Sequence, residues 1–376
     1  MRTVLLISSR SPESPDTWSG ITASITKQLR FEFDVHLLSA DTIFSIRMLS
    51  RVTSILRRLG IRYNEDHSVL RGVLFRFSLL KKLREMRTNN ATTTIVSVAS
   101  VSETLFIPRN YRHVLITDAV FSMIHNQYSR YSGLNWISTK ESYWVDEQAL
   151  RRADQVIFSS SYALERCLTD YSIKQHDEHL KVVSFGYNLP STATNAPTTP
   201  KELRLFFPSV DWYRKGGDIA ISFCNLLSNE FDGQVHLTAI SNDPNIQSFS
   251  TDRLTIEIHP PLRRSDPKTD FLLSEWYTKA DFIILPVRND IAPIAVAESY
   301  AFGKPVLTTP VGNLEYMVHD EKSGFVDPRF DETLARKVVA VKNDVEGYLK
   351  MSEYCTQLSL TEFNWEAWFE QVKTLI

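Results

Sequence analysis

Residues 284–313 read ILPVRNDIAPIAVAESYAFGKPVLTTPVGN. The apolar run that ends at Leu285 predicts a buried strand. Pro293, after a short loop, is well placed as the first residue of a helix, and Gly303, followed two residues later by proline, predicts the end of that helix. The apolar run at residues 305–309 predicts a second strand. A strand, a helix and a strand in this order form the repeating unit of a parallel α/β sheet.

The same alternation of short apolar runs with helical patterns extends over the whole chain. The run that ends at Leu285 begins at Phe282, and the other predicted strands are Thr3–Ile7, Val35–Leu38, Thr94–Val98, His113–Ile116, Gln155–Phe158, Lys181–Phe185, Leu203–Phe207, Val235–Ile240 and Leu254–Ile258. Several are continuous runs of Val, Ile, Leu and Phe, which is typical of parallel strands covered on both faces. The sequence therefore predicts an α/β protein built from doubly wound sheets.

A segment without large apolar residues, Pro190–Pro200, divides the chain into nearly equal halves. It holds three prolines and cannot bury enough surface to fold alone, so it predicts a linker. We expect one Rossmann-like domain at residues 1–187 and another at residues 201–360. Ligands of open α/β sheets bind at the carboxyl ends of the strands, so two such domains are expected to face each other across a ligand-binding cleft.

Composition and charge exclude several classes of protein. With 376 residues the chain can bury sizeable cores, and its net charge of −2 argues against a nucleic-acid binder. Its three cysteines stand far apart, which argues against a disulfide framework or a zinc site and favours a reducing compartment. The first apolar run is too short for a signal peptide, and no run approaches the roughly 18 residues that cross a bilayer. We expect a cytoplasmic protein, with any membrane contact peripheral.

Two basic residues precede a glycine pair in the second half of the chain. Arg214 and Lys215 stand directly before Gly216-Gly217, and a helix is expected to open at Asp218, a good N-cap residue. The free N–H groups of a helix N-terminus, together with two cations, make an anion site suited to a diphosphate. The alternative is a solvated basic turn.

Two acids stand near the helix of residues 284–313. Asp290 lies in the loop before that helix, and Glu298 lies on it, roughly 7–8 Å along its axis. Carboxylates accept hydrogen bonds from sugar hydroxyls, so the pair could hold two parts of a polyhydroxylated ligand. The free N–H groups near Ile291, Ala292 and Ile294 could meet a phosphate. Taken alone, Glu298 could also be a charge on the helix surface, although its neighbours in the sequence are apolar.

Together these segments resemble the retaining glycosyltransferase family 4, which has the GT-B fold of two facing Rossmann-like domains. The spacing Asp290-x7-Glu298 is similar to the Glu-x7-Glu motif of that family, with Asp in place of the first Glu. Four further segments resemble family motifs: Arg214–Gly217, Gly303–Val306, Gly312-Asn313 and Gly324–Val326. The resemblance covers most of residues 201–327.

The first half resembles the family more loosely. Trp18–Ile21 looks like the glycine loop that approaches the donor phosphates and the acceptor, which places Gly20 at that loop. Asp118, after the predicted strand at residues 113–116, stands where relatives often have a histidine or an acid. It could orient a sugar hydroxyl or the acceptor, or it could cap a helix. Residues 361–376 look like the closing helix that packs back on the N-terminal domain.

The resemblance implies metal-independent, retaining transfer of a hexosyl or deoxyhexosyl group from a UDP-, GDP- or TDP-sugar, as in polysaccharide biosynthesis, without a prosthetic group. The donor would be held mainly by the C-terminal domain, and a glycan, lipid-linked or other hydroxyl acceptor by the N-terminal domain. By motif position, Glu298 would bind the ribose hydroxyls, Asp290 the donor sugar, and Arg214 with Lys215 the diphosphate leaving group. Four more residues are implied in donor binding, beside Gly20 and Glu298: Ile291 and Ala292 after the first acid, Gly312 at the glycine turn, and Leu262 in the loop that contacts the base.

Residues Arg47–Arg87 form the most basic part of the chain. They carry eleven Lys and Arg against three acids, mixed with Ile, Leu, Val and Phe. A basic amphipathic stretch predicts contact with a membrane surface, and in that case a lipid-linked acceptor at the inner face of the membrane is expected. The alternative is a solvated helix face beside the acceptor cleft.

Two other functions stay open. A sugar-nucleotide epimerase of related fold would turn over the donor with no acceptor present, and a non-catalytic protein would only bind the nucleotide sugar. A nicotinamide oxidoreductase is disfavoured, because no GxGxxG follows any predicted strand.

Overall fold

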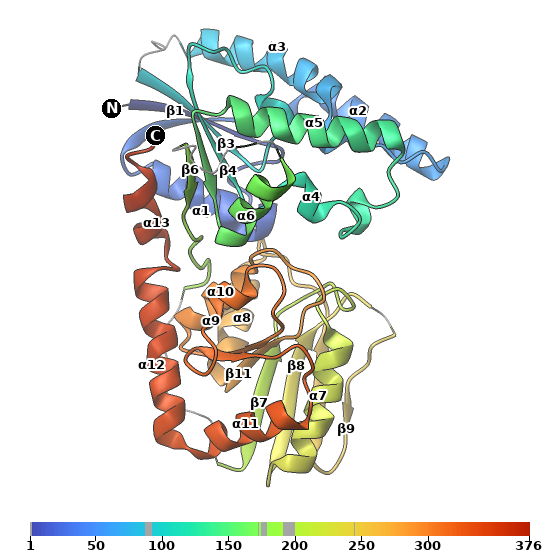
Figure 1. Cartoon of the computed structure of the whole chain (residues 1–376), viewed down its shortest axis with the longest axis vertical. Coiled ribbons are helices and arrows are strands. Elements are labelled where there is room, and N and C mark those ends of the chain that lie inside the picture. The colour runs from blue at the N-terminus through green and yellow to red at the C-terminus, as the bar shows by residue number, and fades with distance from the viewer. Residues whose placement is uncertain (1, 87–91, 172, 174–178, 191–199, 244) are drawn as a thin grey trace. The chain divides into compact units, whose positions relative to one another are not determined.

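The computed structural model describes residues 2–86, 92–171, 173, 179–190, 200–243 and 245–376 (Figure 1). Its internal contacts divide the chain into two compact units, one of Met1–Ser184 with Trp368–Ile376 and one of Phe185–Ala367. Each unit is a predominantly parallel sheet with helices, which confirms the predicted α/β class. Residues 191–199 of the predicted linker lie outside the described residues.

The N-terminal unit contains a parallel sheet with the strand order β2-β1-β3-β4-β5-β6 among the described residues. Its strands are β1 (Arg2–Ser8), β2 (Phe33–Ser39), β3 (Thr93–Val98), β4 (Arg112–Thr117), β5 (Gln155–Phe158) and β6 (Leu180–Val182). The middle strands are apolar and buried, as expected of a sheet covered on both faces. The order reverses between β1 and β3, which makes the carboxyl edge of these strands the topological switch point of this unit.

Helices cover both sides of this sheet, and Figure 1 shows α2, α3 and α5 gathered on one side. The helices are α1 (Ile21–Leu29), α2 (Phe44–Arg58), α3 (Val69–Glu85), α4 (Phe121–Ile124), α5 (Trp136–Arg152) and α6 (Ser161–Asp170). Side-chain oxygens of Ser68, Asn135 and Ser160 accept hydrogen bonds from the first turns of α3, α5 and α6, as good N-caps do. None of the described helices is long and apolar enough to cross a membrane.

The last residues of the chain pack on the same sheet. Helix α13 (Trp365–Val372) ends in the N-terminal unit. The hydroxyl of Thr94 donates to the carbonyl oxygen of Ile376 at 2.8 Å, and the ring of Phe369 meets Phe33 edge-on at 6.4 Å. The C-terminal nine residues therefore complete the core of the first half of the chain.

The second unit contains a sheet with the order β13-β12-β11-β7-β8-β10-β9 among the described residues, parallel except for β9. Its strands are β7 (Glu202–Phe207), β8 (Gln234–Ile240), β9 (Phe249–Ser250), β10 (Leu254–His259), β11 (Phe282–Leu285), β12 (Val306–Thr308) and β13 (Gly324–Val326). Its helices are α7 (Gly217–Glu230), α8 (Pro267–Lys279), α9 (Ile294–Ala301), α10 (Leu314–Met317), α11 (Glu332–Asn343) and α12 (Val345–Thr361). Without β9 this is the Rossmann order 3-2-1-4-5-6, and its switch point lies between β7 and β11.

Two helix starts differ from the prediction. Helix α7 has Gly216 as its N-cap, with a φ of 78°, so Asp218 is its second residue and not its cap. Pro293 is the N-cap of α9 and not its first helical residue, because its ψ of 121° is extended. The predicted end of α9 is confirmed: Gly303 follows the C-cap in the left-handed conformation, and the N–H of Lys304 donates to the carbonyl of Ser299.

Candidate functional site

Three loops meet at the carboxyl edge of the second sheet. Strand β11 pairs in parallel with both β7 and β12, so the loops at residues 208–216, 286–293 and 309–313 leave the sheet side by side. The first two flank the switch point, where doubly wound sheets bind ligands. The basic pair, the first acid and the glycine turn that the sequence singles out all lie in these loops.

Two glycines allow the loops to approach each other closely. Gly216 and Gly312 have φ values of 78° and 63°, a region that side chains disfavour. A Cβ atom on Gly216 would overlap the carbonyl oxygen of Pro286, and one on Gly312 would overlap that of Asp290. Both positions therefore require glycine for the packing of one loop on the next.

Arg214 joins the first loop to the second. Its Nε donates to Oδ2 of Asp211 at 2.7 Å, and its Nη1 donates to the carbonyl oxygen of Asn289 at 2.9 Å. The N–H of Arg288 in turn donates to the carbonyl oxygen of Arg214 at 2.9 Å. The Arg214 guanidinium is thus fixed at the switch point while 20% of its side chain stays exposed.

Lys215 and Asp290 form a largely buried ion pair. Lys215 Nζ contacts Asp290 Oδ2, while Asp290 Oδ1 accepts the N–H of Ile291 at 2.9 Å. Burial, and next the charge of Arg214, lower the pKa of the Lys215 ammonium. The structure thus brings together two residues that the sequence proposes for the site. The expectation that the Ile291 N–H is free for a phosphate is wrong, because the Asp290 carboxylate already accepts it.

Arg288 is a site residue that the sequence analysis missed. Its two terminal nitrogens donate to the two oxygens of Asp218 at 2.7 and 2.6 Å, and its guanidinium lies 4.2 Å from the ring centre of Tyr213. Hydrogen bonding to Arg288 lowers the pKa of Asp218. The Asp218 carboxylate, on the first turn of α7, thus anchors the second loop to that helix.

Glu298 is buried on α9 and only 3% exposed. Its Oε1 contacts Nη2 of Arg264, and its Oε2 accepts the hydroxyl of Tyr277 at 3.2 Å. Burial raises the pKa of the Glu298 carboxyl, and the contacts with Arg264 and Tyr277 oppose that rise. The alternative of a surface charge is therefore wrong. Arg264, which also contacts Asp270 at 3.2 Å, is a second residue that the sequence analysis missed.

The loop after β10 carries both Arg264 and Leu262. Leu262 is half-buried against the apolar cluster that includes Phe302 and Tyr277. Arg263 holds the loop to α8, since its carbonyl oxygen accepts the hydroxyl of Thr269 at 2.6 Å. The loop predicted to contact a base therefore reaches α9 through Arg264.

The N-terminal unit places Gly20 and Asp118 at the carboxyl edge of its own sheet. Trp18, Ser19 and Gly20 have φ values of 48°, 56° and 85°, and Gly20 is the N-cap of α1. The indole N–H of Trp18 donates to Oδ2 of Asp118 at 3.1 Å. Helix α4 has Val120 as its N-cap, so the alternative that Asp118 caps a helix is wrong.

Asp118→Asn tests what this carboxylate does. Burial raises the pKa of Asp118 to about 6, so the folded state binds more protons than the unfolded state between about pH 4 and 6. Its contribution to stability is therefore favourable below this window and is lost as the pH rises through it. Above pH 6 the asparagine variant should be more stable by about 1–2 kcal/mol, because it removes a buried charge and keeps an acceptor for Trp18. Urea unfolding at pH 4 and 7.5 measures this, and equal stability changes at both pH values would contradict it.

Comparisons with known proteins relate the second unit to one family. Residues 202–344 match the family model Glycosyl transferases group 1. The chain is 40% identical over 63 residues to the D-inositol 3-phosphate glycosyltransferase of Thermomonospora curvata, covering 17% of this chain and 15% of that protein. It is 29% identical over 110 residues to the protein of that name from Corynebacterium urealyticum, covering 29% and 26%. The matched regions thus span about a quarter or less of these relatives.

Solved structures resemble the whole chain. A sucrose-phosphate synthase from Thermosynechococcus elongatus superposes with a TM-score of 0.68 at 14% identity, covering 100% of this chain and 98% of that one. HepE of Anabaena, solved in complex with UDP-glucose, superposes with a TM-score of 0.62 at 12% identity, covering 99% and 98%. At these identities the likeness shows the fold, which is GT-B.

Proposed function

We propose that this chain, in which residues 202–344 match the model of the family Glycosyl transferases group 1 and whose fold is GT-B, is a glycosyltransferase with a nucleotide-sugar donor. The observation that carries the proposal is the convergence of Arg214, Lys215 and Asp290 at the switch point of the second sheet, with Glu298 buried on the helix that follows. The complex of HepE with UDP-glucose supports this class of donor.

The diphosphate is proposed to lie at the first turn of α7. This 14-residue helix begins beside Arg214 and directs the positive end of its dipole there. The N–H of Gly217 already donates to the carbonyl oxygen of Trp212, and the Asp218 carboxylate accepts from the backbone of Asp218 and Ile219, so a diphosphate would have to compete for these donors. Lys215 is already paired with Asp290, so an arriving anion meets Arg214 first and competes with the exposed Asp211 for it. Arg214 is therefore the residue that gains most from a phosphate.

Sugar transfer builds positive charge at the anomeric carbon and negative charge on the leaving diphosphate. A cation fixed in advance stabilises this transition state more than the ground state, because it need not reorganise when the charge develops. Arg214 meets this condition through its bonds to Asp211 and Asn289. We assign the same role to Lys215, and we assign contact with the donor sugar to Asp290. We further propose that the transfer retains the anomeric configuration of the donor and needs no metal ion.

Glu298 is proposed to accept the ribose hydroxyls, with the loop of Leu262 beside the base. Its two oxygens contact Arg264 and Tyr277, so a pentose has to share or displace one of these contacts. Ile291, Ala292 and Gly312 shape the wall of the sugar pocket through the close packing of their loops. The proposed acceptor is a glycan or a lipid-linked hydroxyl compound. Asp118 is proposed to orient this acceptor or a sugar hydroxyl, and Gly20 is proposed to lie in the loop that approaches the donor phosphates and the acceptor.

A panel of labelled UDP-, GDP- and TDP-sugars, each with and without glycan acceptors, tests the function. We expect one donor to be hydrolysed or transferred, undiminished by EDTA, and NMR of the product to show the anomeric configuration of the donor. Conversion of the donor to an epimer without an acceptor would instead identify an epimerase. Binding without turnover would indicate a non-catalytic protein, and the absence of any nucleotide binding would overturn the proposal.

A further inference from the structure

Large apolar side chains lie exposed on α2, on α3 and on the loop between them. Nearly half of the exposed large apolar residues in the described part of the chain fall within residues 44–77. They are Phe44, Met48, Val52, Ile55, Leu59, Ile61, Leu70, Val73 and Phe77, which we call the α2–α3 face. Exposed apolar side chains gathered on two helices that contact each other are typical of an interaction site.

On α2 the apolar residues form one stripe. Phe44, Met48, Val52, Ile55 and Leu59 recur at intervals of three and four residues, so they share one side of the helix. The opposite side is buried through Ile46 and Thr53. An ordinary surface helix turns its apolar side inward, whereas α2 turns an apolar stripe outward as well.

Basic residues accompany the stripe. Arg47, Arg51 and Arg58 are exposed and lie along one margin of it, given the helical period of 3.6 residues. Helix α2 contains no acidic residue. On α3, Lys81 and Arg84 are exposed and follow Phe77 by one and two turns on the same side. Arg87, the last residue of the basic stretch, lies outside the described residues.

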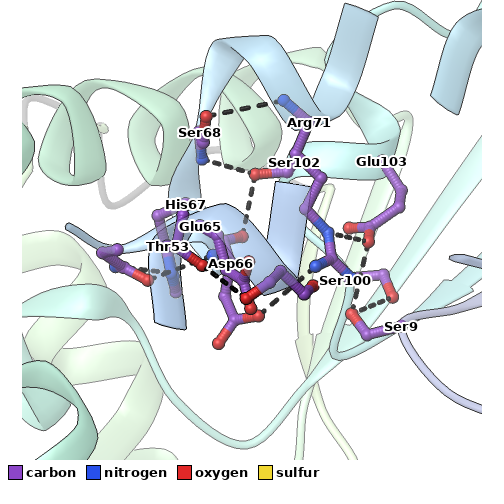
Figure 2. Close-up of polar contacts among 12 residues, drawn as sticks. Ser9, Thr53, Glu65, Asp66, His67, Ser68, Arg71, Ser100, Ser102 and Glu103 are labelled. Atoms are coloured by element: carbon purple, nitrogen blue, oxygen red, sulfur yellow. Dashed lines mark hydrogen bonds and ion pairs between the residues drawn. The ribbon is translucent and has the colours of Figure 1, made fainter. Parts of the chain in front are cut away.

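A buried polar network fixes both helices from beneath (Figure 2). Arg71 is 4% exposed, and its Nε donates to Oε1 of Glu103 at 2.6 Å. Ser102 accepts the N–H of Ser68, the N-cap of α3, at 2.7 Å, and the backbone of Gly72 packs on the Ser102 carbonyl. The hydroxyl of Thr53 on α2 donates to Oε2 of Glu65 at 2.8 Å. The α2–α3 face is therefore preformed.

We propose that the α2–α3 face docks on an anionic lipid membrane. Apolar side chains with arginines at their margin bind the interface of such a membrane, where the chains enter the acyl region and the guanidinium groups meet the headgroups. A second copy of this chain fits less well, because its arginines would face arginines with no acid of α2 to neutralise them. Membrane docking does not depend on the proposed sugar transfer. If the chain both docks on a membrane and transfers a sugar, a lipid-linked acceptor is favoured.

Cosedimentation of the full chain with vesicles tests the charge complementarity. We expect binding to phosphatidylcholine vesicles that contain phosphatidylglycerol at low salt, little binding to pure phosphatidylcholine, and release at high salt. The triple variant Arg47→Gln/Arg51→Gln/Arg58→Gln should bind about a hundredfold more weakly, at roughly fivefold for each arginine. No binding of the wild type to anionic vesicles at low salt would overturn the proposal.

A matched pair of variants tests the apolar stripe. Phe77 and Phe271 are 68% and 71% exposed, but Phe271 lies on α8 of the other unit. Phe77→Ser should weaken vesicle binding on the order of tenfold, and Phe271→Ser should leave it unchanged. Equal effects would overturn the proposal. The proposal would also be overturned if the wild type did not bind vesicles but formed dimers in analytical ultracentrifugation, and if Phe77→Ser converted these dimers to monomers. Nucleotide binding is measured on the same samples. A wild type that binds nucleotide but not vesicles would refute membrane docking alone, and one that binds vesicles but not nucleotide would refute the proposed function alone.

Discussion

Arg214→Ala is expected to lower the turnover number on the order of 10²–10³, with a smaller effect on KM for the donor. The reason is that the guanidinium is held in place before the reaction by Asp211 and by the carbonyl oxygen of Asn289. It can therefore stabilise charge on the leaving diphosphate without moving. A group that acts mainly in the transition state changes kcat, whereas one that binds ground state and transition state alike changes KM.

A matched variant separates this role from packing. Arg204 is also partly buried and also pairs with a carboxylate, that of Glu202 at 3.0 Å, but it lies on β7 and not in the loop that follows the strand. Arg204→Ala should leave kcat within about threefold of the wild type. Arg214→Lys should recover part of the loss, because a point charge remains but the fork that reaches both Asp211 and Asn289 is gone. Steady-state kinetics on the active donor measures all three, and near-normal turnover of Arg214→Ala would refute the assignment.

Most strands were predictable because each contains a short run of consecutive apolar residues in the sequence. Gln155–Phe158 and Phe282–Leu285 coincide with β5 and β11, since each contains three or four consecutive Val, Ile, Phe or Leu residues, and such a short apolar run has few other places in a fold. The predicted strand Lys181–Phe185 ends earlier, at Val182, because its neighbour β5 ends at Phe158, with which Val182 pairs. Strands β9 and β13 were missed because two or three residues carry no periodicity.

The candidate site was predictable where the residues of a sequence motif are also the residues that the backbone geometry of a loop requires. Gly216 and Gly312 lie where left-handed backbone and close loop packing require glycine, so the sequence records the geometry directly. Lys215 and Asp290 are far apart in sequence, but they lie in the loops after β7 and β11, and these two strands pair in parallel. The loops that follow two paired parallel strands leave the sheet at the same edge, which brings the two residues together.

The partners of the acids could not be predicted, because they depend on tertiary contacts that leave no local pattern. Arg264 lies 34 residues before Glu298 in the loop that follows β10, and nothing in its sequence neighbours indicates that it turns toward α9. The same holds for Arg288, whose partner Asp218 is 70 residues away. The nearest signal was the presence of arginine in both loops, because short loops at the carboxyl edge of a doubly wound sheet border the place where such sheets bind ligands.

Glu298→Gln is expected to destabilise the second unit by about 2–4 kcal/mol and to abolish tight nucleotide binding. The glutamine keeps the volume but removes the negative charge, which leaves the Arg264 guanidinium, only 16% exposed, without its main counter-charge. One of its two polar atoms becomes an amide donor, which is tolerated beside the Tyr277 hydroxyl because that oxygen can also accept, so the loss falls mainly on the charge of Arg264. Chemical unfolding measures the first effect and calorimetric titration with the nucleotide measures the second.

The double variant Arg264→Met/Glu298→Gln separates the two effects. Replacing both members of a buried ion pair removes the stranded charge, so most of the lost stability should return, and the cycle with Arg264→Met gives the coupling energy of the pair. Nucleotide binding should stay lost, because the proposed acceptor of the ribose hydroxyls is still missing. If binding returned together with stability, the role of Glu298 would be to hold Arg264 and α9 in place. If the single variant bound nucleotide normally, the pentose would lie elsewhere in the unit.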